Sequence, residues 1–508
     1  MTATAAPEHH DRTVDDVARR AQEVFDSLSR TVPGVRAAAL RGAATALADH
    51  ADELVALAQE ETGLAEARLR GELKRTQVQL RLFAHVVSDG AYLDVRLDEA
   101  DPDFVLGPRP DLRRSLWPVG PVLNFAASNF PFAFSVAGGD TAAALAAGCP
   151  VIVKAHPGHP RLSERTAEIV AAALTEAGLP EGTLQLVASQ DAGVALVEHP
   201  AVRAAAFTGS QRVGQLLAAR AAARPDPIPL FGELGSVNPV LVSAQALHER
   251  ADELLGGYVA SVSGSAGQLC TKPGFLLVPE GTDHDDAVAH AAVQVPEHRL
   301  LNPSIADGYE RRVAQVLGVD GVRVVHAGGV RRGDAGDPGS PADGAGQAWV
   351  TPTFVAVPLD LLRRAGEALL DEVFGPFSVI VEYPDGTDLA AVVAELFPGN
   401  LTLTMHLGER ESSEEQAALV ARLGRHAGRV LLGGWPTGVA VTPAMQHGGP
   451  WPATTTDGTS VGTAAIGRFL RGVAFQDAPQ ELLPPPLRDD NPWGVPRTVA
   501  ARGESLGW

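Results

Sequence analysis

Short apolar segments alternate with helical segments through most of this chain, and this alternation limits the folds open to it. Residues 150–154, Pro-Val-Ile-Val-Lys, are apolar up to Lys154. A strand of this kind is buried on both faces, as in a parallel sheet covered by helices. Further strands are predicted at 121–125, 184–187 and 204–207, with helices at 142–147, 161–177 and 192–198. The sequence therefore predicts an α/β fold with helices on both faces of a parallel sheet.

A second set of strands is predicted after residue 235, and helices precede the first set. The helices are expected from Thr13, which begins a capping box with Asp16, to about residue 90. Residues 102–117 are expected to form an extended hairpin, and the glycine-rich stretch 327–346 an exposed loop. The strands of the second set are predicted at 240–242, 275–278, 322–325, 354–357, 378–381, 401–405 and 430–432.

Charge and cysteine content exclude several classes of function. The chain has 508 residues and a formal net charge of −20. Nucleic acids and anionic membranes need basic patches, so neither is an expected partner. Two cysteines cannot form a disulfide framework, which indicates a reducing compartment. No apolar run is long enough to span a bilayer and residues 1–12 lack an apolar signal segment, so we expect a cytoplasmic protein.

Cys270 is the strongest candidate for a reactive residue. It lies between small and flexible residues, in the run Ser-Gly-Ser-Ala-Gly-Gln-Leu-Cys-Thr-Lys-Pro-Gly at 263–274. A cysteine that only fills a core is usually flanked by bulky apolar residues. Glu233 lies upstream in a turn bounded by Gly232 and Gly235. A thiol nucleophile and a carboxylate base can form and then hydrolyse a thioester.

Other candidates are weaker when each is taken alone. Thr208, Gly209 and Ser210 join a predicted strand to a helix, where free N–H groups suit a phosphate, although most such segments are only turns. Lys154 is predicted at the carboxyl end of its strand, where ligands of open sheets bind. The alternative is that its side chain only extends into solvent. Asn129 and Glu372 are most simply turn residues. Cys149 is expected in the core, and no spacing typical of a metal site occurs.

Taken in order, these segments resemble the aldehyde dehydrogenase superfamily over nearly the whole chain from Thr13. The resemblance rests on Asn-Phe-Pro at 129–131, Lys154, Phe-Thr-Gly-Ser at 207–210, Glu-Leu-Gly-Ser-Val-Asn-Pro at 233–239, Gly-Gln-Leu-Cys at 267–270 and Glu-Val-Phe-Gly-Pro at 372–376. Within the superfamily the chain is similar to an NADP-using branch with 2-oxoglutarate semialdehyde (2,5-dioxovalerate) and fatty aldehyde dehydrogenases. The residues that carry this are 268–274, 154–157 and the segment from 446–450 to 484–486.

The resemblance implies roles for individual residues. Cys270 is the implied nucleophile, which forms a thiohemiacetal and then a thioester, and Glu233 activates the water that hydrolyses it. Asn129 and the backbone N–H of Cys270 are implied to hold the oxyanion. Cofactor contacts are implied for Lys154, His156, Thr208, Gly209, Ser210, Glu372 and Phe374, and no metal is expected.

The resemblance also implies the domain organisation. Two Rossmann-type domains with parallel sheets are expected, a dinucleotide-binding domain at 1–101 and 118–234 and a catalytic domain at 235–469. Residues 102–117 and 470–508 are implied to form an oligomerisation element, in a homodimer or homotetramer.

NADP is the expected cofactor, with NAD as a possible second. NAD-preferring relatives commonly carry a Glu three positions after the strand-end Lys, and its charge would repel a 2′-phosphate. In this chain the third position after Lys154 is Pro157, so that repulsion is missing. His156 can donate to a phosphate.

The substrate and one alternative class stay open. A dicarboxylate semialdehyde such as 2-oxoglutarate semialdehyde needs a cationic clamp, for which Arg299 and Arg468 are candidates. A fatty or aromatic aldehyde needs an apolar tunnel, to which Phe132, Phe475 and Trp451 are candidates to contribute. A cysteine hydrolase or acyltransferase needs a His beside the thiol. None is near Cys270 or Glu233 in sequence, although the fold can bring one in. A non-enzymatic role of the fold would lack Cys270 or Glu233, and both are present.

Overall fold

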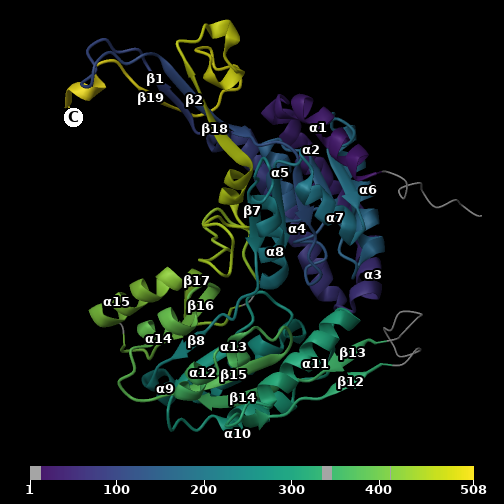
Figure 1. Cartoon of the computed structure of the whole chain (residues 1–508), viewed down its shortest axis with the longest axis vertical. Helices are drawn as coiled ribbons and strands as arrows, with labels where there is room; N and C mark the ends of the chain where they lie inside the picture. Colours follow the sequence, from purple (N-terminus) through teal and green to yellow (C-terminus); the bar gives the residue numbers. More distant parts are fainter. Residues whose placement is uncertain (1–12, 334–345, 412, 437, 508) are drawn as a thin grey trace, which may run out of the picture.

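The computed structural model describes residues 13–333, 346–411, 413–436 and 438–507. Figure 1 shows two units, each built on its own sheet, and an arm that projects from the first. Each unit is a parallel or mostly parallel sheet with helices packed on it, which confirms the predicted α/β fold. No helix of the described residues is both long enough and apolar enough to cross a membrane.

The first unit contains a five-stranded parallel sheet with the order β5-β4-β3-β6-β7. Its strands are β3 (Val122–Phe125), β4 (Val151–Lys154), β5 (Leu184–Val187), β6 (Ala204–Thr208) and β7 (Leu230–Glu233). Strands β3 and β4 are buried along their whole length, as the apolar runs predict. Separate apolar cores cover the two faces of this sheet.

Eight helices build these two cores. Thr13 caps the first helix through a complete capping box with Asp16, as predicted. One face packs against α1 (Val14–Ser29), α7 (Gln190–Glu198) and α8 (Gln211–Ala222). The other packs against α2 (Pro33–Asp49), α3 (Ala51–Thr62), α4 (Glu66–Asp89), α5 (Gly139–Ala147) and α6 (Pro160–Glu176). Cys149 is fully buried there and its Sγ donates to the Phe469 carbonyl, so the predicted core position is confirmed.

The second unit contains a seven-stranded sheet with the order β11-β14-β15-β9-β8-β16-β17, in which only β11 is antiparallel to its neighbour. Each predicted strand of this set is present, with bounds that agree within two residues except for the last, which begins three residues earlier than predicted. The strands are β8 (Val240–Val242), β9 (Phe275–Pro279), β11 (Arg323–His326), β14 (Thr353–Pro358), β15 (Phe377–Tyr383), β16 (Asn400–His406) and β17 (Ala427–Leu432). The helices are α9 (Ala244–Ser263), α10 (Asp285–Val293), α11 (Pro303–Leu317), α12 (Leu359–Ala365), α13 (Glu367–Leu370), α14 (Leu389–Leu396) and α15 (Glu414–Leu423).

A small third sheet extends the second unit. It consists of β10 (His298–Arg299), β12 (Val330–Arg332) and β13 (Ala348–Val350). Strand β12 falls in the stretch expected to be an exposed loop, because its backbone pairs with β13. Residues 334–345 of that stretch lie outside the described part of the chain.

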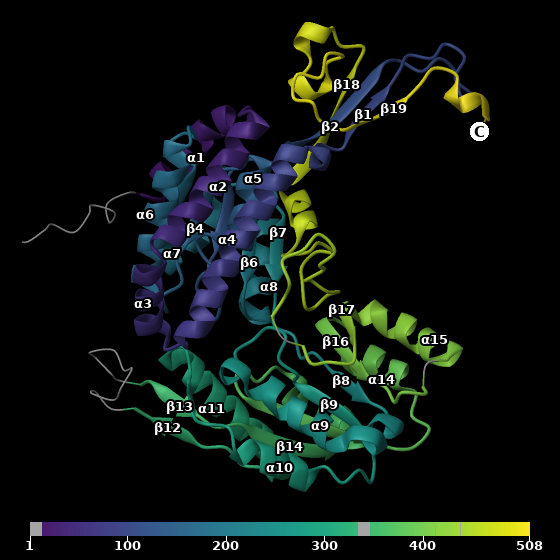
Figure 2. The same cartoon turned by 180° about the vertical axis from the view of Figure 1, so that it is seen from behind.

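The projecting arm is a four-stranded sheet with the order β18-β2-β1-β19 (Figure 2). Its strands are β1 (Val95–Asp98), β2 (Leu112–Pro118), β18 (Leu470–Gln476) and β19 (Arg497–Ala500). The hairpin therefore begins at Val95 rather than at 102, and residues 102–111 are mostly turns. The boundary was misplaced because β1 alternates buried and exposed residues over only four positions, too short a pattern to recognise. Leu483 and Leu487 from the proline-rich segment pack on this sheet.

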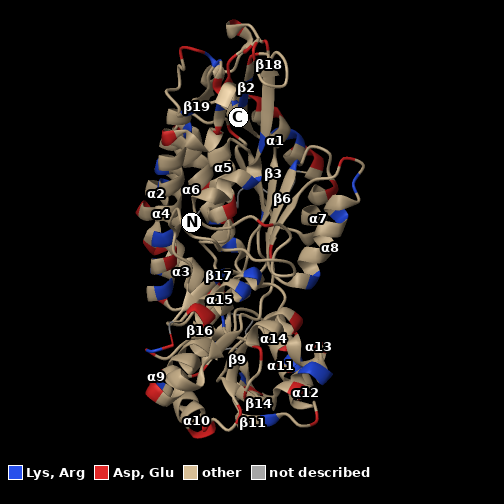
Figure 3. Cartoon of the chain, turned by 90° about the vertical axis from the view of Figure 1, so that its left-hand side faces the viewer, with Lys and Arg blue, Asp and Glu red and all other residues tan. Residues whose placement is uncertain are grey.

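Both signs of charge are mixed over the outer surface. In the view of Figure 3, positions of Lys or Arg and positions of Asp or Glu both occur along the helices of both units. That nucleic acid is not a partner stays a prediction from the net charge of the chain.

Candidate active site

The carboxyl ends of the first sheet gather several predicted site residues at one edge. Lys154 is the last residue of β4, Thr208 of β6 and Glu233 of β7, and Thr208 lies directly opposite Glu233 in the ladder. Gly209 then donates its N–H to the Glu233 carbonyl at 3.0 Å. Ligands of open parallel sheets bind outside this edge. The parallel topology therefore brings residues that are far apart in sequence to one place.

The turn after β6 offers backbone donors to an anion. Ser210 is the N-cap of α8 and accepts from the Val213 N–H at 3.4 Å. The first N–H groups of a helix have no partner within the helix, and the helix dipole favours negative charge there. The position suits a phosphate, as the sequence predicts for residues 208–210.

Lys154 and His156 lie at the next strand end. Burial lowers the pKa of Lys154, and burial, with smaller contributions from His159 and Lys154, lowers the pKa of His156 to about 3. The His156 imidazole is therefore neutral at physiological pH. Its Nδ1 accepts from the Gly158 N–H at 3.0 Å, so the ring proton resides on Nε2. His156 is thus a neutral donor rather than a cation.

Cys270 lies in a loop that follows α9 and has an unusual backbone. Ser265, Ala266 and Gly267 have φ values of 53°, 56° and 64°, which is the left-handed region. The two non-glycine residues are strained there, and such strain persists only where surrounding contacts hold it. At Gly267 an added Cβ would lie 2.2 Å from the Gly375 carbonyl oxygen. This close approach explains why the motifs at 267–270 and 372–376 come together.

Asn238 fixes the other side of the Cys270 loop. Its side-chain amide donates to the carbonyls of Cys270 at 2.8 Å and of Lys272 at 3.1 Å. Asn238 itself is buried with a positive φ of 45°. The segment that begins with Glu233 therefore also positions the thiol loop.

The central contact of the site joins Cys270, Glu233 and a histidine that the sequence analysis did not identify. His447 Nε2 is 2.9 Å from Glu233 Oε1 and 3.4 Å from Cys270 Sγ. His447 is fully buried and Glu233 nearly so, whereas Cys270 is partly exposed. Ser460 donates to the second carboxylate oxygen of Glu233. A thiol, an imidazole and a carboxylate thus share one cluster, in which a proton can move between them.

The charges in this cluster oppose one another. Burial raises the pKa of Glu233. The charge and hydrogen bond of His447, together with the hydrogen bonds of Ser460 and Cys270, outweigh burial and hold this pKa below its ordinary value. Burial, and next the Glu233 charge, raise the pKa of Cys270 well above that of a free thiol, and Arg75 partly offsets this. The resting cluster is therefore an ionised carboxylate beside a protonated thiol.

Asn129 lies on the other side of the thiol loop. Its side-chain amide donates to the Gln268 carbonyl at 3.0 Å, which leaves its second N–H hydrogen available. Glu72 holds the following turn by accepting from the N–H groups of Phe132 and Ala133. The Cys270 N–H donates to no other group among the described residues. Two donors can therefore face an oxygen bound near the thiol.

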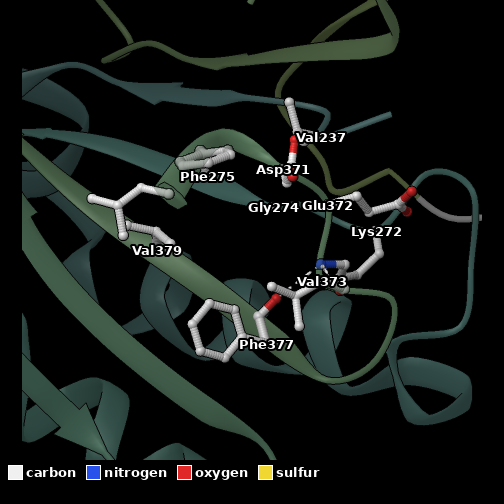
Figure 4. A pocket seen from close by; sticks show the side chains of 10 residues that line it. Val237, Lys272, Gly274, Phe275, Asp371, Glu372, Val373, Phe377 and Val379 are labelled. Carbon is white, nitrogen blue, oxygen red and sulfur yellow. Dashed lines mark hydrogen bonds between the residues drawn. The ribbon is translucent and has the colours of Figure 1, made fainter. Parts of the chain in front are cut away.

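Glu372 comes from the second unit and meets the first-unit motif at Gly235, and Phe374 follows two residues later in the same loop. An added Cβ at Gly235 would lie 2.4 Å from Glu372 Oε2, so the carboxylate packs on that glycine. Glu372 and Lys272 line one small cavity (Figure 4). Burial raises the pKa of Glu372 to about 7 and lowers the pKa of Lys272 to about 8, each partly offset by the charge of the other.

Glycines position the segment that carries His447. An added Cβ at Gly428 of β17 would lie 1.4 Å from the Gly448 carbonyl oxygen, and one at Gly449 would lie 2.0 Å from the Asn400 carbonyl. His447 is 177 residues from Cys270 and 214 from Glu233 along the chain. No local spacing predicts such a contact. Its only sequence signal is the Gln-His-Gly-Gly-Pro motif at 446–450, which the resemblance uses without assigning the histidine a role.

The same three residues have the donor set of a metal site. The ligand atoms of Glu233, Cys270 and His447 lie within 4.8 Å of one another. Two guanidinium groups, on Arg75 and Arg429, act electrostatically on the same thiol. Their charges oppose a cation in this cluster and favour an anion.

The fold and site together define an α/β enzyme with a cysteine, a histidine and a carboxylate in one cluster. The profile of the aldehyde dehydrogenase family matches residues 2–395. The chain is 42% identical over 497 residues to alpha-ketoglutaric semialdehyde dehydrogenase 2 of Azospirillum brasilense, covering 97% of this chain and 92% of the relative. It is 39% identical to alpha-ketoglutaric semialdehyde dehydrogenase of Acinetobacter baylyi, covering 96% and 90%.

Solved structures agree on the fold. Aldehyde dehydrogenase 21 of Physcomitrella patens superposes with a TM-score of 0.73 at 20% identity, covering 92% of this chain and 90% of that chain. This chain belongs to the aldehyde dehydrogenase family and is an oxidoreductase that acts on aldehydes with NAD(P). A histidine beside Cys270 is also what a cysteine hydrolase needs, so the family match, rather than the cluster alone, decides between the two classes.

The opposing charges predict how the thiol titrates. Because Glu233 raises the pKa of Cys270, Glu233→Gln is expected to move the pH profile of Cys270 alkylation by iodoacetamide to lower pH. Glu372→Gln is the matched control, because the charge of Glu372 also raises the pKa of Cys270 but by less than that of Glu233. Peptide mass spectrometry follows the modification, with Cys149 as the buried reference. An unchanged profile in Glu233→Gln, or a larger shift in the control, would contradict this electrostatic account.

Proposed function

We propose that this protein oxidises 2-oxoglutarate semialdehyde to 2-oxoglutarate, with Cys270 as nucleophile and Glu233 and His447 as proton-handling groups. The observation that carries the roles is the cluster in which His447 Nε2 lies 3.4 Å from the Cys270 sulfur and 2.9 Å from the Glu233 carboxylate. The proposed substrate is the one after which the two relatives at 42% and 39% identity are named.

The resting charges define the first step. The thiol is protonated, so attack on the aldehyde carbon requires the S–H proton to leave as the C–S bond forms. The ionised Glu233 carboxylate, with His447 hydrogen-bonded to it, is the acceptor that the geometry provides. The oxygen of the resulting thiohemiacetal lies against the free N–H donors of Asn129 and Cys270.

Oxidation and release follow from the same cluster. Bound NAD(P) would supply the hydride acceptor, and loss of a hydride from the carbon of the deprotonated thiohemiacetal leaves a thioester on Cys270. Once Glu233 has released the thiol proton to solvent, it takes a proton from the water that attacks the thioester carbon, the C–S bond breaks to release a carboxylic acid, and the Cys270 thiolate regains a proton. Ser460 and His447 keep Glu233 ionised and oriented for this step. A carboxylate base beside the thiol favours water over another acyl acceptor.

Removing the sulfur tests the reaction. Cys270→Ala is expected to abolish aldehyde-dependent formation of reduced cofactor, because no thioester can form. Cys149→Ala is the matched control and is expected to keep activity, since Cys149 is fully buried in the core of the first unit. The assay uses 2-oxoglutarate semialdehyde, succinate semialdehyde, decanal and benzaldehyde. Persistent oxidation in Cys270→Ala excludes the mechanism, and highest kcat/KM for decanal or benzaldehyde excludes the substrate.

The cofactor-binding residues support a preference for NADP over NAD. Lys154 and the backbone donors at 208–210 lie at one sheet edge, and Glu372 from the second unit packs on Gly235 beyond that edge. Pro157 replaces the carboxylate that would repel a 2′-phosphate. His156 presents a neutral Nε2–H donor near the same strand end. A phosphate accepts from such a donor, and no negative charge stands at position 157 to oppose it.

A single charge tests this preference. The KM for NADP is expected to be lower than that for NAD in the wild-type enzyme. Pro157→Glu is expected to raise the KM for NADP by at least about tenfold, because it restores the repulsion, while the KM for NAD changes less. Ala172→Glu adds the same charge at an exposed position of α6 and serves as control. A strong NAD preference in the wild type would refute the proposal.

The projecting arm supports a homodimer or homotetramer. Strands β18 and β19 are the outer strands of its sheet, and outer strands present unpaired N–H and C=O groups to other chains. Several large apolar side chains of the arm are exposed, and such exposure marks association surfaces. These are Val105, Leu106, Leu482, Val499 and Leu506, all more than half exposed.

Size-exclusion chromatography with light scattering tests the assembly. The wild-type protein is expected to have the mass of two or four chains. Val499→Arg is expected to reduce that mass, because it places a charge on outer strand β19 of the arm. Val330→Arg makes the same change on exposed strand β12 of the second unit and is the control. A single-chain mass for the wild type would exclude this proposal.

A further inference from the structure

Two arginines face the cluster with nitrogens that no other group satisfies. Arg75 lies on α4 of the first unit and Arg429 on β17 of the second. Among the described residues, Nη1 and Nη2 of Arg75 and Nε and Nη2 of Arg429 are buried without a hydrogen-bond partner. Buried donors are nearly always satisfied, and each unsatisfied one is costly. Such nitrogens are therefore candidates for contact with a bound ligand.

Contacts place Arg75 close to the nucleophile. Its Nε donates to the Val439 carbonyl at 3.2 Å, and its guanidinium carbon is 5.1 Å from the Phe134 ring centroid. The Phe134 ring is in turn 6.3 Å from the His447 ring, which contacts Cys270. One aromatic ring therefore separates the guanidinium group from the cluster. Phe134 and the backbone of Val439 hold Arg75 while its two terminal nitrogens stay free.

Arg429 reaches the same thiol from the second unit. The charge of Cys270 acts on the guanidinium groups of both Arg429 and Arg75, so both lie within electrostatic range of the sulfur. Glu233 also acts on Arg75. The buried Glu72 carboxylate acts on Arg75 more strongly than Glu233 does, but it also interacts with Arg68. The guanidinium groups of Arg68, Arg75 and Arg429 therefore exceed the carboxylates of Glu72 and Glu233, which favours an anionic ligand near Cys270.

The two arginines suggested by sequence are occupied elsewhere. Arg468 forms a buried ion pair with Asp140. Arg299 donates to Gln347 and to the Glu61 carbonyl. By contrast, Arg75 and Arg429 keep buried nitrogens without a hydrogen-bond partner among the described residues. The cationic clamp that a dicarboxylate semialdehyde requires therefore has a different location from the one expected.

We infer that Arg75 and Arg429 bind the carboxylate of a short ω-oxo acid while its aldehyde carbon lies at Cys270. This assignment rests on the proposed function and adds the residues that select its substrate. A planar guanidinium matches a carboxylate in two parallel hydrogen bonds, and the charge strengthens each. The alkyl chain of a fatty aldehyde would leave the same buried donors unsatisfied. The pair therefore selects carboxylate-bearing aldehydes over apolar ones.

Charge-removing variants test the clamp. Arg75→Met and Arg429→Met are each expected to raise the KM for succinate semialdehyde and 2-oxoglutarate semialdehyde by about 10- to 100-fold, as for loss of a hydrogen bond to a charged group. The kcat/KM for pentanal, which lacks the carboxylate, is expected to fall much less than that for the semialdehydes, because only the effect of the arginine on the Cys270 thiol is lost. Arg75→Lys keeps the charge but not the two-pronged geometry, and is expected to fall between wild type and Arg75→Met. Arg81→Met, at an exposed position of the same helix, is the matched control.

A binding measurement separates recognition from folding. The product 2-oxoglutarate is expected to protect Cys270 of the wild-type enzyme and of Arg81→Met from iodoacetamide, and to give Arg75→Met little protection. The pH profile of alkylation is also expected to move to higher pH in Arg75→Met, because this cation lowers the pKa of Cys270. A merely structural role for Arg75 would produce neither change in a variant with wild-type circular dichroism.

The outcomes distinguish the two proposals. A wild-type enzyme that prefers pentanal or decanal to both semialdehydes overturns the proposed substrate, and the clamp with it. The clamp alone is overturned if the wild type prefers the semialdehydes but the arginine variants lose as much activity on pentanal as on the semialdehydes. It is also overturned if these variants keep both activities. Equal protection of Cys270 by 2-oxoglutarate in wild type and Arg75→Met also overturns the clamp.

Discussion

The hydrogen bond between His447 and Glu233 is the contact on which the site depends. Glu233 is a nearly fully buried carboxylate, and an unpaired charge in such a place costs several kcal/mol, of the order of 3–5 when a partner is removed. His447 and Ser460 bind its two oxygens, so the carboxylate stays ionised beside the thiol. The contact also links β7 of the first unit to a segment that packs on β17 of the second. A proton acceptor for Cys270 therefore exists only when both units are folded together.

Backbone packing, rather than side-chain size, sets this geometry. Gly428 and Gly449 allow the chain around His447 to approach β17 and β16 to distances that exclude a Cβ. Gly267 does the same for the thiol loop against Gly375, and Asn238 donates across the loop to the carbonyl of Cys270. Close backbone contacts of this kind are rigid, because shifting them requires the whole segment to move. The nucleophile and its proton acceptor are consequently held from opposite sides by fixed backbone.

Local patterns allowed most of the fold and part of the site to be predicted. The apolar strand that ends in Lys154 and the capping box at Thr13 depend on neighbours in sequence, so their structure follows from short segments. The parallel topology then brings strand ends such as Thr208 and Glu233 together without further information. His447 and Arg75 could not be found this way, because each reaches the thiol only through tertiary packing. The ion pair of Arg468, one of the two clamp candidates, could not be foreseen for the same reason, because its partner Asp140 is 328 residues away.

The distribution of charge implies when the thiolate forms. In the resting state burial and Glu233 raise the pKa of Cys270, and Arg75 offsets this only in part. If a substrate carboxylate binds Arg75 and Arg429, it neutralises the cations that would stabilise a thiolate. A preformed thiolate would then be least stable at the moment of attack. The proton must therefore pass to the Glu233–His447 pair as the C–S bond forms, which gives the carboxylate its first task before it activates water. The same balance keeps the thiol protonated, and hence weakly reactive, when no aldehyde is bound.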